Sequence, residues 1–329
     1  MSSDYNLLNP RPTYKPFDYN WAYDAYRIQN QIHWLPEEVP MDDDIQDFKA
    51  KLTKPEINLL TQVLRFFVQS DLEVQNNYMT NLGQKFRTPE VAMMLMSFAN
   101  MEGIHQQAYS HLIDTLGLPE SEYNAFLSYK EMKEKCEYIH KFNVASNYEL
   151  AKTLVTFGAF LEGVQLFSSF AILMNFPRRG IMKGVGKIIK FSIKDESLHS
   201  RSMAKLFKTF DQEFNIRSSN EEFDLEIYKI CNEMIVLEDR FIDLCFEMGA
   251  VEGLTAQSIK DYIRFIADVR LIDFGFQPIY KIAKDPIPWL ADMIGGKEVA
   301  LFFEQKVSEY SKNSLTGSIN FDAEIQING

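Results

Sequence analysis

Two pairs of potential metal ligands stand out in the sequence, each a glutamate followed three residues later by a histidine. They are Glu102-x-x-His105 and Glu196-x-x-His199. On an α-helix, residues three apart are neighbours on one face, so a Glu and a His with this spacing can bind one metal ion or a bridged pair. The two pairs therefore indicate metal chemistry carried on helices.

An isolated acid precedes each pair in an apolar stretch: Asp71 lies upstream of the first and Glu162 upstream of the second. A buried acid is costly unless it binds something, and metal coordination is a common solution. Two Glu-x-x-His helices that face two single-acid helices would supply four carboxylates and two imidazoles, which is the ligand set of ferritin-like dimetal bundles. The predicted ligands of a dinuclear metal centre are Asp71, Glu102, His105, Glu162, Glu196 and His199.

Other residues with similar spacing provide a check on this pattern. A third pair, Glu137-x-x-His140, follows the charged run from Lys130 to Cys136, which is typical of a solvent-exposed face. We expect this pair to have no metal role. Glu73 shares a predicted helix with Asp71 but points about 200° away from it, so we expect Glu73 to face solvent.

Helices are predicted nearly throughout, and no alternating β-pattern of useful length competes with them. Starts are marked by the capping-box patterns Thr53-x-x-Glu56, Ser146-x-x-Glu149 and Ser219-x-x-Glu222. The chain is thus predicted to be all-α, with a ferritin-like four-helix bundle core, additional helices and a flexible C-terminal tail. The predicted helices span about 54–85, 89–116, 147–175, 182–209, 219–248, 255–274 and 297–310.

Composition limits the domain organisation and the classes of partner. No seam divides the 329 residues, so we expect one domain over 19–310, preceded by an extended segment over 1–18 and followed by a tail over 311–329. The formal charge of −12 and the lack of a basic block argue against nucleic acid as a partner. Three unpaired cysteines and a polar start without a signal peptide favour the cytoplasm.

One segment is long and apolar enough to suggest a membrane span. From Thr153 to Phe176 the only charged residue is Glu162. A single spanning helix is the alternative interpretation. The central helix of a thick bundle is favoured, because neighbouring helices have the same apolar density and carry acids at comparable places.

Four stretches resemble, in the same order, the small, radical-generating subunit of class I ribonucleotide reductase. The resemblance extends from about Tyr19 to the C-terminus and includes residues outside the ligand set. The stretches are Phe66 to Asp71, Met101 to Ser110, Leu161 to Gly163 and Lys194 to His199.

The resemblance implies the same six metal ligands and places the radical-bearing tyrosine of the family at Tyr109. Helix geometry supports this, since Tyr109 lies four residues after His105, about 40° around the axis and about 6 Å along it. The family's apolar radical pocket is matched by Phe170, whereas Leu166 stands where phenylalanine is common. We expect the pocket to remain apolar and a radical to form.

Three further residues match the family's route for radical transfer. The resemblance implies that Trp34 and Asp195 form a hydrogen-bonded chain with His105, and that Tyr310 passes oxidation to the large subunit. Without the resemblance, Trp34 would be read as a hydrophobic anchor, Asp195 as a surface acid and Tyr310 as a tyrosine at a helix end.

The implied function is that of the small subunit of ribonucleoside-diphosphate reductase. Its dimetal centre would activate oxygen and generate a tyrosyl radical, which a large catalytic subunit uses to reduce ribonucleotides. Two iron ions are the first expectation and manganese the alternative. The resemblance also implies a homodimer, docking of the tail over 311–329 to the large subunit, and a flavoprotein activator if superoxide is needed.

Two other functions fit the same ligand set. A di-iron oxidase that acts directly on a bound fatty acid would need a channel to the metals, but no relay through Trp34, Asp195 and Tyr310. A ferritin-like iron-storage protein would hold the metals as cargo and would be a shorter chain in a far larger oligomer.

Overall fold

Capping residues start the long helices close to where the sequence predicts. Thr53 and Glu56 bond to each other reciprocally at the start of α3 (Lys54–Asn76), and the Thr53 amide donates to Glu56 Oε2 at 2.7 Å. The amide of Glu149 donates to Ser146 Oγ at 3.2 Å at the start of α8 (Asn147–Val155). These side chains satisfy amides that have no partner within the helix.

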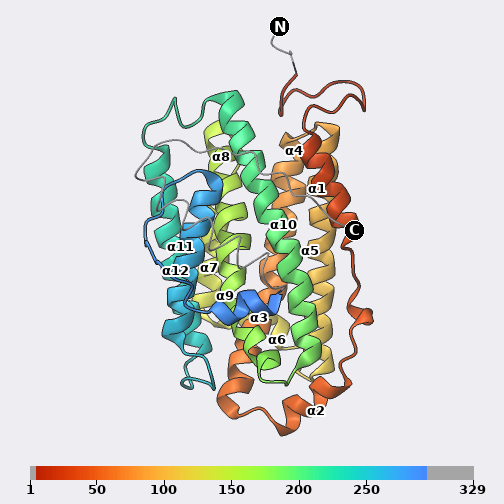
Figure 1. Cartoon of the computed structure of the whole chain (residues 1–329), viewed down its shortest axis with the longest axis vertical. Helices are drawn as coiled ribbons and strands as arrows, with labels where there is room; N and C mark the ends of the chain where they lie inside the picture. Colours follow the sequence, from red (N-terminus) through yellow and green to blue (C-terminus); the bar gives the residue numbers. More distant parts are fainter. Residues whose placement is uncertain (1–4, 295–329) are drawn as a thin grey trace.

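The computed structural model of the chain describes residues 5–294, and over that range it is an all-helical bundle without a strand (Figure 1). This confirms the predicted fold class. Four long helical segments carry the predicted ligands. In chain order, they are α3 with its continuation η2 (Asn77–Leu82) and α4 (Gly83–Lys85); α5 (Pro89–Thr115); α8 with η4 (Thr156–Gln165) and α9 (Leu166–Arg178); and α10 (Lys183–Phe214).

These segments pack in two pairs, α3 against α5 and α10 against η4 and α9. Further helices surround the four, and Figure 1 shows α2 across one end of the bundle. The surrounding elements are α1 (Asn20–Gln31), η1 (Pro36–Glu38), α2 (Asp42–Ala50), α6 (Glu122–Ala125), η3 (Phe126–Ser128), α7 (Lys130–Ile139), α11 (Phe223–Cys245), α12 (Ala256–Phe274) and α13 (Pro288–Ile294).

The predicted start of one helix at residue 219 is wrong. Asn215 adopts a left-handed backbone (φ 54°) that ends α10, and turns continue from there, with the Ser219 amide donating to the Asn215 carbonyl at 3.0 Å. α11 therefore starts only at Phe223, and no side chain caps it. The predicted helix over 297–310, Tyr310 and the tail over 311–329 lie outside the described residues.

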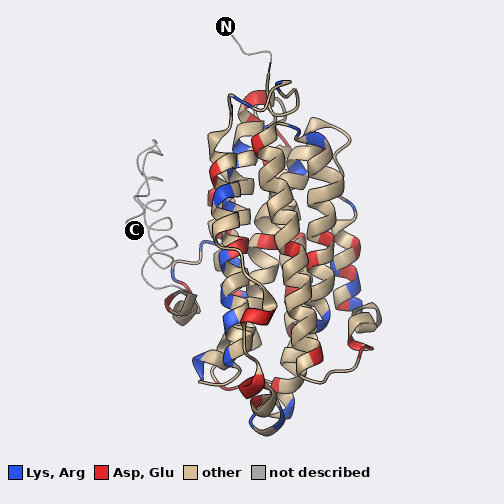
Figure 2. Ribbon diagram, turned by 90° about the vertical axis from the view of Figure 1, so that its right-hand side faces the viewer, with Lys and Arg blue, Asp and Glu red and all other residues tan. Residues whose placement is uncertain are grey.

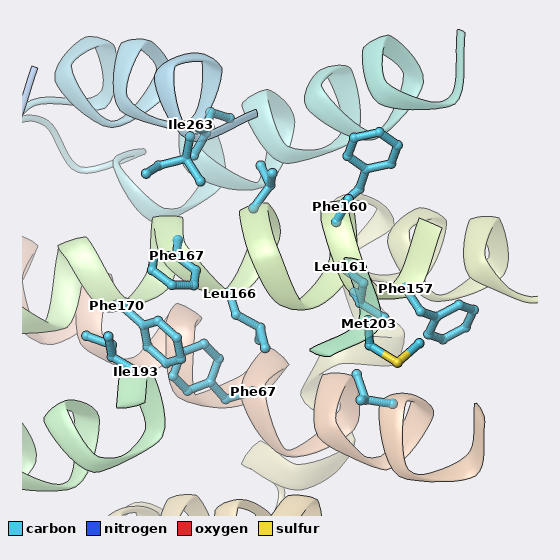
Figure 3. Close-up of a cluster of buried hydrophobic side chains, with 14 of the residues drawn as sticks. Phe67, Phe157, Phe160, Leu161, Leu166, Phe167, Phe170, Ile193, Met203 and Ile263 are labelled. Carbon is cyan, nitrogen blue, oxygen red and sulfur yellow. The ribbon is translucent and has the colours of Figure 1, made fainter. Parts of the chain in front are cut away.

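The apolar segment that resembles a membrane span is the central helix of the core. The helix from Asn147 to Arg178 is long and apolar enough to cross a membrane, yet its apolar window is completely buried in the protein. Figure 3 shows its side chains Phe160, Leu166 and Phe170 inside a hydrophobic cluster. The bundle interpretation is thus favoured over the membrane span.

The prediction that the charged run before the third Glu-x-x-His pair is a solvent-exposed face is wrong in part. Lys135 is fully buried and binds Glu238 of α11 at 2.6 Å, because long-range packing places its ammonium between two aromatic rings. Glu137 and His140 are exposed, as expected. Glu73 is mostly covered rather than solvent-facing, since His140 contacts its carboxylate at 2.9 Å.

Candidate metal centre

The six predicted ligands converge from four helical segments at one buried position, which we call the six-ligand cluster. Each side chain is at most 1% exposed. Their potential ligand atoms form two groups that share Glu102, and the atoms of each group lie within 4.8 Å of one another. Figure 2 shows acidic residues on several helices at about half the height of the bundle. One group is Asp71, Glu102 and His105, and the other is Glu102, Glu162, Glu196 and His199.

Two carboxylates lie between the two histidines. Glu102 places Oε2 3.4 Å from His105 Nδ1 and Oε1 3.0 Å from His199 Nδ1. Glu196 places Oε1 3.1 Å from His105 Nδ1 and Oε2 3.4 Å from His199 Nδ1. Glu102 and Glu196 would therefore offer one oxygen on the side of each histidine, while Asp71 would add a carboxylate near His105 and Glu162 one near His199.

The residues fit a metal pair, because their polar atoms are buried without hydrogen-bond partners. Both oxygens of Asp71, Glu102 and Glu196 lack such a partner, and so do Nδ1 of the two histidines. A buried polar group without a partner costs about 1–3 kcal/mol, and more if charged. An oxygen and nitrogen donor set of this kind suits iron or manganese.

The pKa values of the cluster also indicate that a positive charge would stabilise its carboxylates. Burial, and then the charge of Glu102, hold the pKa of Asp71 well above its usual range, and burial followed by Glu196 does the same for Glu162. Burial alone would lower the pKa of His199, but Glu102 and Glu196 outweigh it and raise the value to about 10. Without metal the cluster retains protons that a bound cation would replace.

The outer nitrogen of each histidine faces a polar side chain. His105 Nε2 lies 3.1 Å from Asp195 Oδ2, the atom that also accepts a 2.8 Å hydrogen bond from Trp34 Nε1. Burial raises the pKa of Asp195, but His105 and Trp34 overcome this and lower it below the usual value. The structure thus brings Trp34, Asp195 and His105 together, with Asp195 buried rather than at the surface.

Gln29 of α1 contacts the outer nitrogen of His199, as Asp195 contacts that of His105. The sequence analysis did not predict this residue. Its Oε1 lies 3.1 Å from His199 Nε2, and its Nε2 donates to Asp195 Oδ1 at 2.8 Å. Outer partners of this kind fix the orientation of metal-binding imidazoles. Gln29 belongs to no motif, so no local signal in the sequence could have identified it.

Tyr109 is completely buried one turn beyond His105, and their ring centroids are 6.2 Å apart. Its hydroxyl donates to Ser192 Oγ at 2.9 Å, and its ring packs on Phe67 at 4.5 Å. Figure 3 shows Phe67 in one apolar cluster with Leu166 and Phe170. The surroundings of Tyr109 are therefore apolar, as expected despite the leucine.

The helix that carries Glu162 widens at the cluster. Thr156–Gln165 is π-helical, a form that is frequent at functional sites. Arg270 Nε of α12 donates to the Gly163 carbonyl at 3.1 Å. A side chain at residue 163 would collide, since an added Cβ would lie 2.8 Å from that nitrogen. Glycine next to Glu162 thus allows the buried Arg270 to hold the widened turn.

Known proteins share this architecture and sequence. The family model described as ribonucleotide reductase, small chain, matches residues 11–286. The probable ribonucleoside-diphosphate reductase small subunit of Invertebrate iridescent virus 3 is 41% identical, with 94% of this chain and 87% of the relative covered. The ribonucleotide reductase R2 subunit from Clostridium botulinum has a TM-score of 0.80 at 24% identity, covering 87% of this chain and 92% of that one.

A solved dimanganese(II) protein, NrdF from Streptococcus sanguinis, shares the fold with a TM-score of 0.71 at 20% identity, covering 89% of this chain and all of that one (100%). The family match covers most of the chain, and it supports the reductase interpretation over direct oxidation of a ligand or iron storage. The chain therefore belongs to the ribonucleotide reductase small-chain family, the small subunits of the oxidoreductase ribonucleoside-diphosphate reductase.

Proposed function

We propose that the six-ligand cluster binds two metal ions and that Tyr109 stores the oxidising equivalent as a radical. One observation carries the proposal: two histidines and the two carboxylates between them converge with atoms that lack hydrogen-bond partners, and a buried tyrosine lies beside one of the histidines. When bound, the metal pair would supply the oxidising power that protein side chains lack.

The residues around Tyr109 suit the formation and protection of a phenoxyl radical. Burial, and then the charge of Asp71, raise the pKa of Tyr109 well above its usual value, so the phenol keeps its proton until it is oxidised. Ser192 orients the hydroxyl, and the Phe67 ring covers one side of the phenol. Tyr109 is 0% exposed, so the position where the radical would be held is shielded from solvent.

We infer that the chain Trp34, Asp195 and His105 carries oxidation outward from the cluster. Asp195 accepts the Trp34 Nε1 proton and faces His105 Nε2, so it links the ring to the ligand through a single carboxylate oxygen. Tyr310 and the tail over 311–329 would continue this route to the large subunit.

Membership of the family implies pairing with the large catalytic subunit and formation of a dimer. We propose two iron ions as the native pair, and the dimanganese(II) neighbour keeps manganese as the alternative. Activation with superoxide from a flavoprotein would accompany manganese. Location in the cytoplasm stays a prediction.

The test is metal loading followed by electron paramagnetic resonance. The protein should bind two ions per chain and, after exposure to oxygen, show a tyrosyl signal that Tyr109→Phe abolishes without loss of metal, because only the phenolic oxygen is removed. Tyr262→Phe, at a buried tyrosine of α12, is the matched control and should retain the signal. An unchanged signal in Tyr109→Phe would assign the radical to another residue. Parallel loading with iron and with manganese would decide between the metals.

A further inference from the structure

A second tyrosine lies beside the other histidine of the six-ligand cluster. Tyr78 is in the π-helical turn η2, two turns after Asp71, and it is 1% exposed. Its ring meets His199 edge-on, with centroids 6.1 Å apart, and packs against Phe98 at 5.9 Å. The separation of Tyr78 from His199 nearly equals the 6.2 Å between Tyr109 and His105. Each metal-binding histidine thus has one buried tyrosine next to it.

The two tyrosines differ in what their hydroxyls contact. Tyr109 donates to Ser192, whereas the Tyr78 hydroxyl is buried and has no hydrogen-bond partner within residues 5–294. Glu162 Oε2 is also buried and lacks a partner there. Since an unsatisfied buried hydroxyl costs about 1–3 kcal/mol, a small movement that joins this donor to that acceptor is favourable.

The neighbours of Tyr78 support this pairing. The Tyr78 ring contacts His199, and the ligand atoms of His199 and Glu162 lie within 4.8 Å of each other. The Tyr78 hydroxyl is therefore next to a carboxylate that can accept its proton. The Phe98 ring packs against Tyr78 at 5.9 Å and against His199 at 4.2 Å, so it covers both rings with apolar surface.

We propose that Tyr78 is a second oxidisable tyrosine of the metal centre, on the Glu162 and His199 side, which takes up the oxidising equivalent when Tyr109 cannot. The proposal rests on the proposed dimetal function. When bound, the metal pair would supply the oxidising power of dioxygen, and Tyr78 would give up one electron to it. Its O–H bond would break, the proton would pass to the Glu162 carboxylate, and a neutral phenoxyl radical would remain.

The experiment uses the full chain with Tyr109→Phe, loaded with ferrous ions without oxygen, mixed with dioxygen and frozen within milliseconds to seconds. We expect a tyrosyl signal that arises from a residue other than Tyr109. The signal should fall severalfold or more in Tyr109→Phe/Tyr78→Phe. It should persist in Tyr109→Phe/Tyr262→Phe, since the pKa of Tyr262 is raised by burial and Asp285, not by a cluster carboxylate.

Metal content is measured on every sample, so a loss of signal through lost metal is recognised. If the double variant loses metal, ring-deuterated tyrosine in Tyr109→Phe gives a second readout. Deuteration must narrow the resonance lines of a tyrosyl radical, and the electron spin of a radical beside the metals must relax fast. The proposal is overturned by a loaded, oxidised Tyr109→Phe protein without an organic radical, by a signal that does not narrow, or by one that survives removal of Tyr78. If instead the wild-type signal is unchanged in Tyr109→Phe and absent in Tyr78→Phe, the proposed role of Tyr109 is refuted and that of Tyr78 is not.

Discussion

Two of the clusters of buried charge within residues 5–294 differ in one respect: only one of them is complete by itself. Around Glu238, Lys135 binds one carboxylate oxygen, Ser168 donates to the other, and the Lys135 ammonium lies 4.0 Å from the centre of the Phe66 ring. In the six-ligand cluster, by contrast, both oxygens of Asp71, Glu102 and Glu196 lack a hydrogen-bond partner. Burial therefore does not distinguish a structural cluster from a binding site. The atoms left without partners do.

The largest effect should follow from removing a ligand. Glu162→Gln keeps the volume but removes a terminal carboxylate, so we expect metal affinity to fall by more than about 100-fold, beyond the range for outer partners. The metal-free variant should be at least as stable as the metal-free wild type, because one of several repelling buried acids is gone. Metal analysis and urea unfolding check both parts. Two tightly held ions per chain in the variant would exclude Glu162 from the ligand set.

The Lys135 cluster should respond in the opposite way. Lys135→Met leaves Glu238 buried without its cation, which typically costs about 3–5 kcal/mol of unfolding free energy. Lys135→Met/Glu238→Leu removes both charges and should recover most of that loss. Denaturant unfolding of the metal-free proteins measures both values. A double variant no more stable than the single one would indicate that the pair contributes more than mutual neutralisation.

A matched pair of amide substitutions compares the clusters directly. Asp195→Asn should lower turnover with the large subunit by on the order of 10- to 100-fold with little change in stability, because it alters an outer partner of His105. Glu238→Gln should leave metal loading and the radical intact while stability falls. Turnover, metal content and unfolding of both variants give the test. Equal losses of turnover would remove the distinction between the two acids.

The last prediction is a pH dependence of stability that bound metal abolishes. The folded-state pKa of His199, about 10, exceeds the unfolded value of 6.5, so its stabilisation is complete below pH 6.5 and is lost as pH rises toward 10. Asp71 and Glu162 have raised pKa values and act with the same sign. Metal-free protein should lose up to about 1.4 kcal/mol per pH unit for each proton involved.

Bound metal replaces those protons, so the metal-loaded protein should lack this slope between pH 6.5 and 8.5. Glu238 lies outside the six-ligand cluster, and burial raises its pKa. Its contribution to the pH dependence of the unfolding free energy therefore cancels when the metal-free and metal-loaded proteins are compared. Urea unfolding at both pH values, with and without metal, is the measurement. Parallel pH dependence in the two forms would contradict proton replacement at the cluster.

The same contrast explains what the sequence could predict. Spacing along single helices predicted Glu102, His105, Glu196 and His199, and isolated acids in apolar stretches predicted Asp71 and Glu162. The structure groups all six side chains, while their binding of metal and the role of Tyr109 stay predictions. Gln29, Tyr78 and the Lys135 to Glu238 pair depend on contacts between distant segments. Lys135 in particular sits in a run of charges, and only packing against Phe66 and Phe241 reveals that it is buried.

The apolar helix around Glu162 has a consequence for how the protein is made. Before it packs, the segment from Thr153 to Pro177 leaves the ribosome as a stretch that the membrane-insertion machinery could accept by length and hydropathy. A charged residue at the centre of such a stretch costs on the order of 3 kcal/mol on insertion. The carboxylate that we propose as a metal ligand would therefore also oppose insertion of the nascent chain into a lipid bilayer.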